Sequence, residues 1–428
     1  MDRVNLLDES TFETGGGLWT GKKGPFATAT VIRNTNFTES GRVDYSDVAV
    51  LDVEAKQLAK RRLASGDIIV ERSGGGPNQP VGRVVFFDRD EGVFSHSNFT
   101  SRLRVIDTER FLPKFVFYFL LYFHDSKQTD HLQRRTTGIR NLDWQAYRES
   151  AAVPLFALSE QRQIAAVLSA VQRAIERQER LIALTAELKK ALMHKLFTEG
   201  TRHEPLKQTE IGPVPKSWSL SLASESFAIQ EGQVDPTQSP YREMLHVGPE
   251  NIEPGSGRLL RLRTNGELGI KSGNYLFTSE HILYSKIRPY LNKVTLPSFT
   301  GTCSADMYPL LPQRRRFSRS FLFQYLLSPS FVKQASSHQE RTGIPKINRN
   351  QLSSTQIPTP PPEEQSLIDR VLSTCDVKLS THIRTGAALN ALFRCLLHQL
   401  MTAQISVRQL NLSALGIEEI GKEPAGVT

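Results

Sequence analysis

The chain has 428 residues, and its 53 lysines and arginines outnumber 44 aspartates and glutamates, which gives a formal net charge of +9. That length is enough for two or three domains with separate cores, and the isoelectric point near 9.4 favours a polyanionic partner such as nucleic acid. The three cysteines have no CxxC spacing, and no apolar run approaches the roughly 18 residues of a membrane span, so we expect a soluble cytoplasmic protein with reduced thiols.

Residues 1–155 are expected to form a mixed α/β domain. Short runs rich in β-branched residues, separated by turns with glycine, asparagine and aspartate, predict its strands. An aromatic helix is expected after Pro113, because proline is tolerated in the first turn of a helix. The predicted strands lie at residues 29–32, 67–70, 81–87 and 103–106.

Residues 156–203 are expected to contain a long amphipathic helix. Apolar side chains recur at helical spacing from Ile164 to Leu192, and Gly200 is suited to end the helix. A helix of about 38 residues would be about 57 Å long, which exceeds what one small domain can cover.

The second half of the chain repeats this order. Prolines and glycines around 205–215 stop the first helix, so residues 204–357 are expected to form a linker and a second mixed α/β domain. Residues 358–404 are predicted to be a second long helix with a proline-rich entrance. Residues 405–428 are expected to form a weakly ordered tail.

The repeat is also visible residue by residue. Pro154 and Gln161 align with Pro358 and Gln365, and the match continues without a gap to the ends of both helices. Upstream, the aromatic segment 115–121 aligns with 321–327, so the chain is a duplication.

Two long helices in one chain can cover each other's apolar stripes as an antiparallel coiled coil. Gln178, Gly386 and Asn390 interrupt the expected seam. We therefore expect a loose helical pair rather than a strict heptad zipper.

The two copies diverge after the equivalent segments 67–70 and 281–284, and we expect the mismatched stretches to bind the target. Lysine and arginine neutralise phosphates, and arginine or asparagine can read base edges in the major groove. For any one of these residues, a solvated basic surface is the alternative interpretation. The candidate DNA-binding residues are Lys22, Arg33, Asn34, Arg72, Ser73 and Arg140 in the first half, and Lys286, Arg288, Arg341 and Lys346 in the second.

Catalytic motifs are weak. Residues 16–23 nearly match a phosphate-binding loop, but Lys23 stands where a magnesium-binding hydroxyl is needed. Asp44 and the Glu54-Ala55-Lys56 stretch have the outline of a nuclease metal site without its usual proline, so a surface ion pair is the better interpretation. The histidines have no metal-ligand spacing, and no methyltransferase motif occurs. No catalytic, cofactor-binding or metal-binding residue is predicted.

The layout resembles the DNA-specificity subunit of type I restriction–modification systems. The resemblance covers residues from about 15 to 403 and rests on four features. They are LYSKIRPYL at 283–291, GTCSAD at 301–306, the linker at 210–218 and the two Pro-x(6)-Gln helix entrances. The first copy departs from the Lys-Ile-Arg-Pro-Tyr stretch and has a glycine-rich loop instead.

The resemblance implies two target-recognition domains, each reading one half of a bipartite site in double-stranded DNA. It also implies that the helices set the spacing and dock two methyltransferase subunits, with a motor/nuclease restriction subunit as a further partner. The chain itself would be non-catalytic, and S-adenosylmethionine, ATP and magnesium would bind the partner subunits. Two alternatives stay open: a stand-alone DNA nuclease or modification enzyme, and a coiled-coil protein–protein scaffold.

Overall fold

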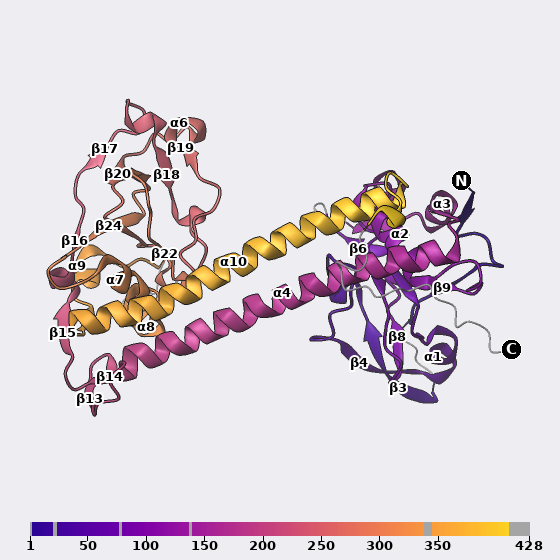
Figure 1. Cartoon of the computed structure of the whole chain (residues 1–428), viewed down its shortest axis with the longest axis horizontal. Coiled ribbons are helices and arrows are strands. Elements are labelled where there is room, and N and C mark those ends of the chain that lie inside the picture. The colour runs from indigo at the N-terminus through magenta and orange to yellow at the C-terminus, as the bar shows by residue number, and fades with distance from the viewer. Residues whose placement is uncertain (1, 20–23, 77–78, 137–138, 338–344, 411–428) are drawn as a thin grey trace. The chain divides into compact units, whose positions relative to one another are not determined.

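A computed structural model of the chain describes residues 2–19, 24–76, 79–136, 139–337 and 345–410. The chain divides into two compact units, Met1–Glu179 with Arg384–Thr428, and Arg180–Ile383. Each unit contains one α/β domain and one end of each of two long helices, α4 (Leu158–Glu199) and α10 (Pro362–Met401) (Figure 1). No helix in the described part of the chain is both long and apolar enough to cross a membrane.

The first α/β domain is built around an antiparallel sheet in the order β2-β9-β5-β7. A smaller sheet, β4-β3-β8, contains the parallel pair β3–β8, and a third sheet has the order β10-β11-β6. Its strands are β1 (Arg3–Asn5), β2 (Phe12–Gly16), β3 (Phe26–Ile32), β4 (Ala49–Glu54), β5 (Ile68–Glu71), β6 (Ser73–Gly75), β7 (Val84–Phe86), β8 (Phe94–His96), β9 (Thr100–Val105), β10 (Gln133–Thr136), β11 (Ile139–Leu142) and β12 (Ala152–Pro154). Its helices are α1 (Ala55–Arg61), α2 (Pro113–Asp125) and α3 (Trp144–Ser150), with 3-10 turns η1 (Asn34–Asn36) and η2 (Asp130–Leu132).

The second α/β domain has the corresponding antiparallel sheet in the order β16-β24-β21-β22. Its other large sheet, β17-β20-β23-β18-β19, contains the parallel pair β18–β23. The strands are β13 (Leu206–Thr209), β14 (Gly212–Pro215), β15 (Ser219–Leu222), β16 (Phe227–Ile229), β17 (Gln233–Val234), β18 (Leu245–Val247), β19 (Arg263–Thr264), β20 (Asn274–Phe277), β21 (Ile282–Ser285), β22 (Val294–Thr295), β23 (Gly301–Cys303), β24 (Met307–Pro312) and β25 (Gln356–Thr359). The helices are α5 (Ala223–Ser226), α6 (Asn265–Leu268), α7 (Arg319–Leu326), α8 (Pro329–Ser337) and α9 (Arg349–Ser353), with 3-10 turns η3 (Tyr241–Glu243), η4 (Pro249–Asn251) and η5 (Pro289–Leu291).

The two domains share one topology. β2, β9, β5 and β7 take the places of β16, β24, β21 and β22, and each domain is closed by a strand pair next to its long helix, β1–β12 or β15–β25. The predicted fold class, two α/β repeats that each precede a long helix, is confirmed.

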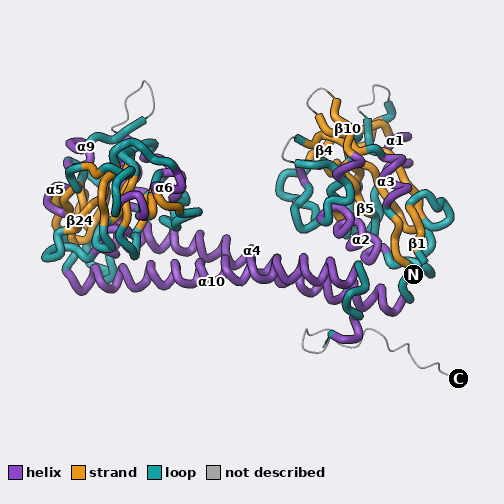
Figure 2. The backbone as a smooth tube through the Cα atoms, turned by 90° about the horizontal axis from the view of Figure 1, so that it is seen from above, coloured by secondary structure: helices purple, strands orange, loops and turns teal. Residues whose placement is uncertain are grey.

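The long helices pair antiparallel, as predicted. In the first unit, Ile164 and Leu168 near the start of α4 share a core with Leu397 near the end of α10. In the second unit, Leu196 near the end of α4 shares a core with Leu372 near the start of α10. Figure 2 shows α4 and α10 side by side.

The seam does not follow the apolar stripe of α4 throughout. Leu181, Leu184 and Leu188, which continue the predicted stripe, are 41%, 52% and 54% exposed. The less exposed positions instead continue from Ile175 with spacings of three and four, because paired helices keep a 3.5-residue repeat while an apolar stripe can drift from it. This line passes through Gln178, Ile182, Thr185 and Lys189, and the Lys189 ammonium pairs with the Asp376 carboxylate at 2.6 Å.

A buried glutamine fixes the start of each long helix. Gln161 Oε1 accepts from the backbone N–H of Leu112 at 2.9 Å, and its Nε2 donates to the carbonyls of Arg110 at 2.9 Å and Phe156 at 3.0 Å. Gln365 repeats all three bonds in the second unit, since Ser318 N–H donates to its Oε1 at 3.2 Å and its Nε2 donates to two carbonyls. Each amide therefore joins a long helix to the segment that begins the aromatic helix of the same domain.

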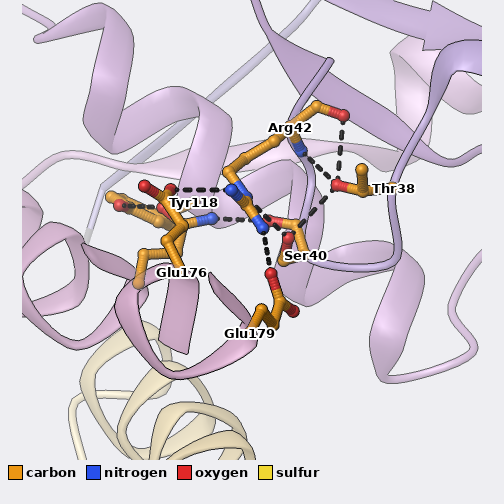
Figure 3. A network of polar contacts seen from close by, with 7 residues as sticks. Thr38, Ser40, Arg42, Tyr118, Glu176 and Glu179 are labelled. Atoms are coloured by element: carbon orange, nitrogen blue, oxygen red, sulfur yellow. Dashed lines mark hydrogen bonds and ion pairs between the residues drawn. The ribbon is translucent and has the colours of Figure 1, made fainter. Parts of the chain in front are cut away.

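A polar network adds a second connection in the first unit (Figure 3). Arg42, in a loop of the α/β domain, contacts the α4 carboxylates of Glu176 at 3.2 Å and Glu179 at 2.8 Å. Tyr118 on α2 donates from its hydroxyl to Gln172 Oε1 at 2.7 Å. At the equivalent place in the second unit, Gln324 on α7 donates to Asp376 on α10 at 2.8 Å.

Residues that follow α4 form hydrogen bonds with the first turn of α10. Glu364, buried in the first turn of α10, accepts from the Trp218 indole N–H at 3.0 Å and from the Thr201 backbone N–H at 2.8 Å. Gly200, with φ +67°, lies against this carboxylate and Trp218. After α10, Val407 in the 3-10 turn η6 (Val407–Gln409) is fully buried in the first core, and the rest of the expected tail, 411–428, lies outside the described residues.

Replacing Gln161 with leucine should destabilise the first unit. The substitution leaves the Leu112 N–H and two carbonyls without their partner, which should cost about 2–4 kcal/mol at roughly 1 kcal/mol per bond. Urea denaturation measures the loss. Gln163→Leu, two residues along the same helix, is the control and should cost less than about 0.5 kcal/mol; equal midpoints for both variants would contradict the assigned role.

Gly257→Ala should destabilise the fold more than Gly255→Ala does, although both glycines have φ +72°. A Cβ at Gly257 would lie 2.7 Å from the Phe323 ring and from the Val294 carbonyl oxygen, whereas nothing lies within 4 Å of one at Gly255. We expect an additional destabilisation of about 1–3 kcal/mol from the clash. Thermal unfolding of the two variants in parallel measures the difference, and identical melting curves would rule out a packing role.

Candidate nucleic-acid interface

Three of the predicted residues in the first domain lie together where β5 continues into β6. Arg72 and Ser73 follow β5 directly, and β6 pairs with β11, which carries Arg140 opposite Gly75. The backbone N–H of Arg72 donates to the Phe99 carbonyl at 2.8 Å. Strand pairing therefore joins residues that are far apart in sequence.

Arg72 is held from two sides. Its guanidinium lies 5.3 Å from the centre of the Trp144 ring, and Nη1 donates to the Ser101 hydroxyl at 3.4 Å. Partial burial lowers the pKa of the Arg72 guanidinium, and the neighbouring charge of Arg148 lowers it further. An arginine nevertheless keeps its charge in a protein, so Arg72 is an oriented cation with limited freedom.

The structure places Arg33 and Asn34 differently. Arg33 Nη2 donates to the Asp47 carbonyl at 3.1 Å and lies 3.7 Å from its carboxylate. Asn34 Nδ2 instead points toward strands β5 and β6, where it donates to Glu71 Oε1 at 3.2 Å and to the Ser73 carbonyl at 3.3 Å. Asn34 thus adjoins Arg72 and Ser73, while the Arg33 side chain turns toward Asp47.

The second domain brings its candidates together at the same position of the fold. Lys286 and Arg288 follow β21, as Arg72 follows β5, and Ile287 forms a β-bridge with Lys346. The Arg288 backbone N–H donates to the Pro345 carbonyl at 2.7 Å, and Arg288 has φ +49°. The side chains of Arg288 and Lys346 are exposed. Lys22 and Arg341 lie outside the described residues.

Lys286 has different neighbours from Arg72. Its Nζ donates to the Ala305 carbonyl at 2.6 Å, lies 3.6 Å from the Asp306 carboxylate and is 5.8 Å from the centre of the Tyr308 ring. The two domains therefore present a cation at one shared position in two distinct chemical settings.

Sequence reasoning missed the residue beside each cation. The Lys286 N–H donates to the Asp306 carbonyl at 3.0 Å, as the Arg72 N–H donates to the Phe99 carbonyl, so Phe99 and Asp306 are equivalent. Phe99 is 43% exposed. An exposed phenylalanine can contact a thymine methyl group, whereas a carboxylate can accept from cytosine. Only strand pairing reveals this equivalence, because the loops between the strands differ in length.

Asp44 and Glu54 of the nuclease-like motif make local hydrogen bonds. Glu54 Oε2 accepts from the Gln57 side chain at 3.0 Å, and Asp44 Oδ1 accepts from the Ser46 N–H at 2.9 Å. Among the residues that the structure describes, no three histidine, cysteine, aspartate or glutamate side chains are placed to hold a metal ion.

Part of the chain matches a known family model. Residues 257–388 match the type I restriction modification DNA specificity domain. The match begins inside the second α/β domain and extends well into α10, so it includes Lys286, Arg288 and Gln365.

Two proteins of similar sequence are named as specificity subunits of type I restriction enzymes. The EcoDI type I restriction enzyme specificity subunit of Escherichia coli is 37% identical over 166 residues, which is 39% of this chain and 36% of that protein. This chain therefore matches little more than a third of the length of that relative. The putative MjaX specificity subunit of Methanocaldococcus jannaschii is 25% identical over 84% of this chain and 83% of its own length.

Solved structures share the fold. The S subunit of a type I restriction-modification system from M. genitalium has a TM-score of 0.56 at 16% identity, covering 93% of this chain and 95% of that one. A chain from a study of type I R-M complex assembly has a TM-score of 0.51 at 18% identity, covering 91% of this chain and 97% of that one. Residues 257–388 thus match the type I restriction modification DNA specificity domain, and the fold of the chain is similar to that of the S subunit from M. genitalium.

Proposed function

We propose that this chain is the DNA-specificity subunit of a type I restriction–modification complex and reads a bipartite site in double-stranded DNA. One observation carries the proposal: the two α/β domains present a cation at the same position of one topology, with different neighbours. A shared scaffold with altered side chains suits two half-sites of different sequence.

The candidate residues divide by their surroundings. Arg72 and Lys286 are held in place by rings and backbone groups, which suits base-edge reading, because a donor that is already positioned loses little conformational freedom when it binds. Exposed Arg288 and Lys346 suit phosphate contacts, which position the protein without reading sequence. The further proposed DNA-binding residues are Lys22, Arg33, Asn34, Ser73, Arg140 and Arg341.

The paired helices are proposed to dock two methyltransferase subunits. Leu181, Leu184 and Leu188 lie on one exposed side of α4, where they are free to pack against a partner. In this assignment the chain performs no catalysis. S-adenosylmethionine would bind the methyltransferases, ATP and magnesium would serve an additional restriction subunit, and the complex would act in the cytoplasm.

Selection from duplexes with randomised bases tests the reading function. The full chain, purified with its co-expressed methyltransferase, should enrich two short fixed segments separated by a spacer of unspecified bases. Arg72→Gln should relax one segment and Lys286→Gln the other, each by about 5- to 150-fold per base contact. Lys378→Gln on the exposed side of α10 removes the same charge and should preserve both segments. Absence of any enriched segment would refute the proposed function.

Leu184→Glu tests the docking surface. A carboxylate at this exposed position should lower the amount of methyltransferase that co-purifies at least tenfold, because it would be buried at the interface without a partner. Unfolding should stay unchanged. Ala183→Glu, on a neighbouring exposed position, is the control; unchanged co-purification of the Leu184 variant would exclude this face.

A further inference from the structure

A buried carboxylate and an arginine tie the loop after β3 (residues 33–37) to strand β5. Glu71 is fully buried, and Arg83 contacts it at two points, Nε to Oε2 at 2.8 Å and Nη2 to Oε1 at 2.7 Å. The same guanidinium donates to the Asn34 carbonyl at 3.1 Å and to the Phe37 carbonyl at 3.4 Å. One side chain therefore connects the strand with two points of the loop.

Asn34 completes this connection through its side chain. Its Nδ2 donates to Glu71 Oε1 and to the Ser73 carbonyl, so the loop is held against the first residue of β6. Arg33 and Asn34 belong to this loop, and Arg72 follows Glu71 directly. The network consequently determines where the proposed reading residues of the first domain lie.

The second domain keeps the cation without the carboxylate. The Ser285 N–H donates to the Lys293 carbonyl at 3.0 Å, as the Glu71 N–H donates to the Arg83 carbonyl at 2.8 Å, so Lys293 takes the place of Arg83. Lys293 Nζ donates to the Pro249 carbonyl at 2.6 Å. Pro249 begins the 3-10 turn η4 in the loop after β18 (residues 248–252), as Asn34 begins η1.

The loops themselves are equivalent. Asn36 Oδ1 accepts from the Arg33 N–H at 2.9 Å, and Asn251 Oδ1 accepts from the Gly248 N–H at 2.9 Å. A few residues later, Gly41 and Gly257 have φ +76° and +72°, and a Cβ at either would collide with a ring of the aromatic helix. Both domains thus build the same loop and fasten it from the same side.

The cation has two possible roles, which are to compensate a buried carboxylate and to hold the loop through its carbonyl. A buried arginine–carboxylate pair can be retained simply because each charge compensates the other. Ser285 stands in the place of Glu71, so charge compensation at that position does not account for Lys293. The bond from the cation to the loop carbonyl is the feature that both domains share.

We propose that Arg83 and Lys293 are positioning residues that hold the reading loops of their own domains, so that each sets the base preference at one half-site. They act through the loops after β3 and β18. The inference rests on the proposed function and identifies residues that would shape specificity without contacting a base.

Lys293→Met and Lys293→Arg in the full chain, co-expressed with its methyltransferase, test the proposal by selection from randomised duplexes. Lys293→Met should relax the half-site of the second domain roughly tenfold, about the value of one base contact, and should leave the other half-site unchanged. Lys293→Arg should keep the preference that Lys293→Met loses, because arginine can reach the same carbonyl. Lys378→Met is the charge-matched control, and thermal unfolding reports on the integrity of each variant.

Arg83→Lys gives an independent test in the first domain. It keeps a donor for the loop carbonyl, as the second domain does, and should retain most of the first half-site preference. Arg83→Met with Glu71→Gln removes the donor without leaving a buried unpaired charge, and should relax that half-site alone.

The outcomes separate the two proposals. A parent chain that enriches no bipartite site refutes the proposed function. A parent chain that enriches one, with both half-sites retained in Lys293→Met and in the Arg83→Met/Glu71→Gln variant, overturns the positioning role. Equal loss at both half-sites, not reversed by Lys293→Arg, also overturns it, because that result indicates general destabilisation.

Discussion

The architecture depends on the pairing of α4 with α10, and a buried glutamine ties each α/β domain to that pair. Gln161 and Gln365 make the same three hydrogen bonds, which join the start of a long helix to the segment that opens an aromatic helix. Because a buried amide is costly to leave unsatisfied, each domain has one preferred seating on its helix. In the proposed function, the position of each DNA-reading surface relative to its helix would follow from these bonds.

The two domains share their scaffold and differ in the residues that surround the shared cation. The sheet order, the loop after β3 or β18 and the glycine under the aromatic helix are retained in both copies. The residues beside the shared cation differ, with Trp144 and Phe99 in the first copy and Asp306 and Tyr308 in the second. In the proposed function, the residues beside the cation would differ between the two half-sites while the fold that presents them stays the same.

The sequence predicts the helices and their pairing well, because the repeat there runs without a gap. It predicts the seam less well: Leu181, Leu184 and Leu188 suggested a continuous apolar stripe, but the paired helices place Lys189 inside instead. The match of Arg83 with Lys293, or Phe99 with Asp306, could not be found from sequence, because hairpins of different length separate these positions and only backbone pairing aligns them. Tyr118–Gln172 and Gln324–Asp376 lie at aligned positions, but both members of the pair differ between the copies, so the alignment alone does not reveal their contact.

The proposed function requires that this chain gives a methyltransferase its sequence preference. The most direct measurement is a genome-wide map of methylated bases in the host, compared with a host that lacks only this chain. Methylation at one bipartite motif should disappear without the chain and return when the chain is restored. An unchanged methylation map would refute the proposed function.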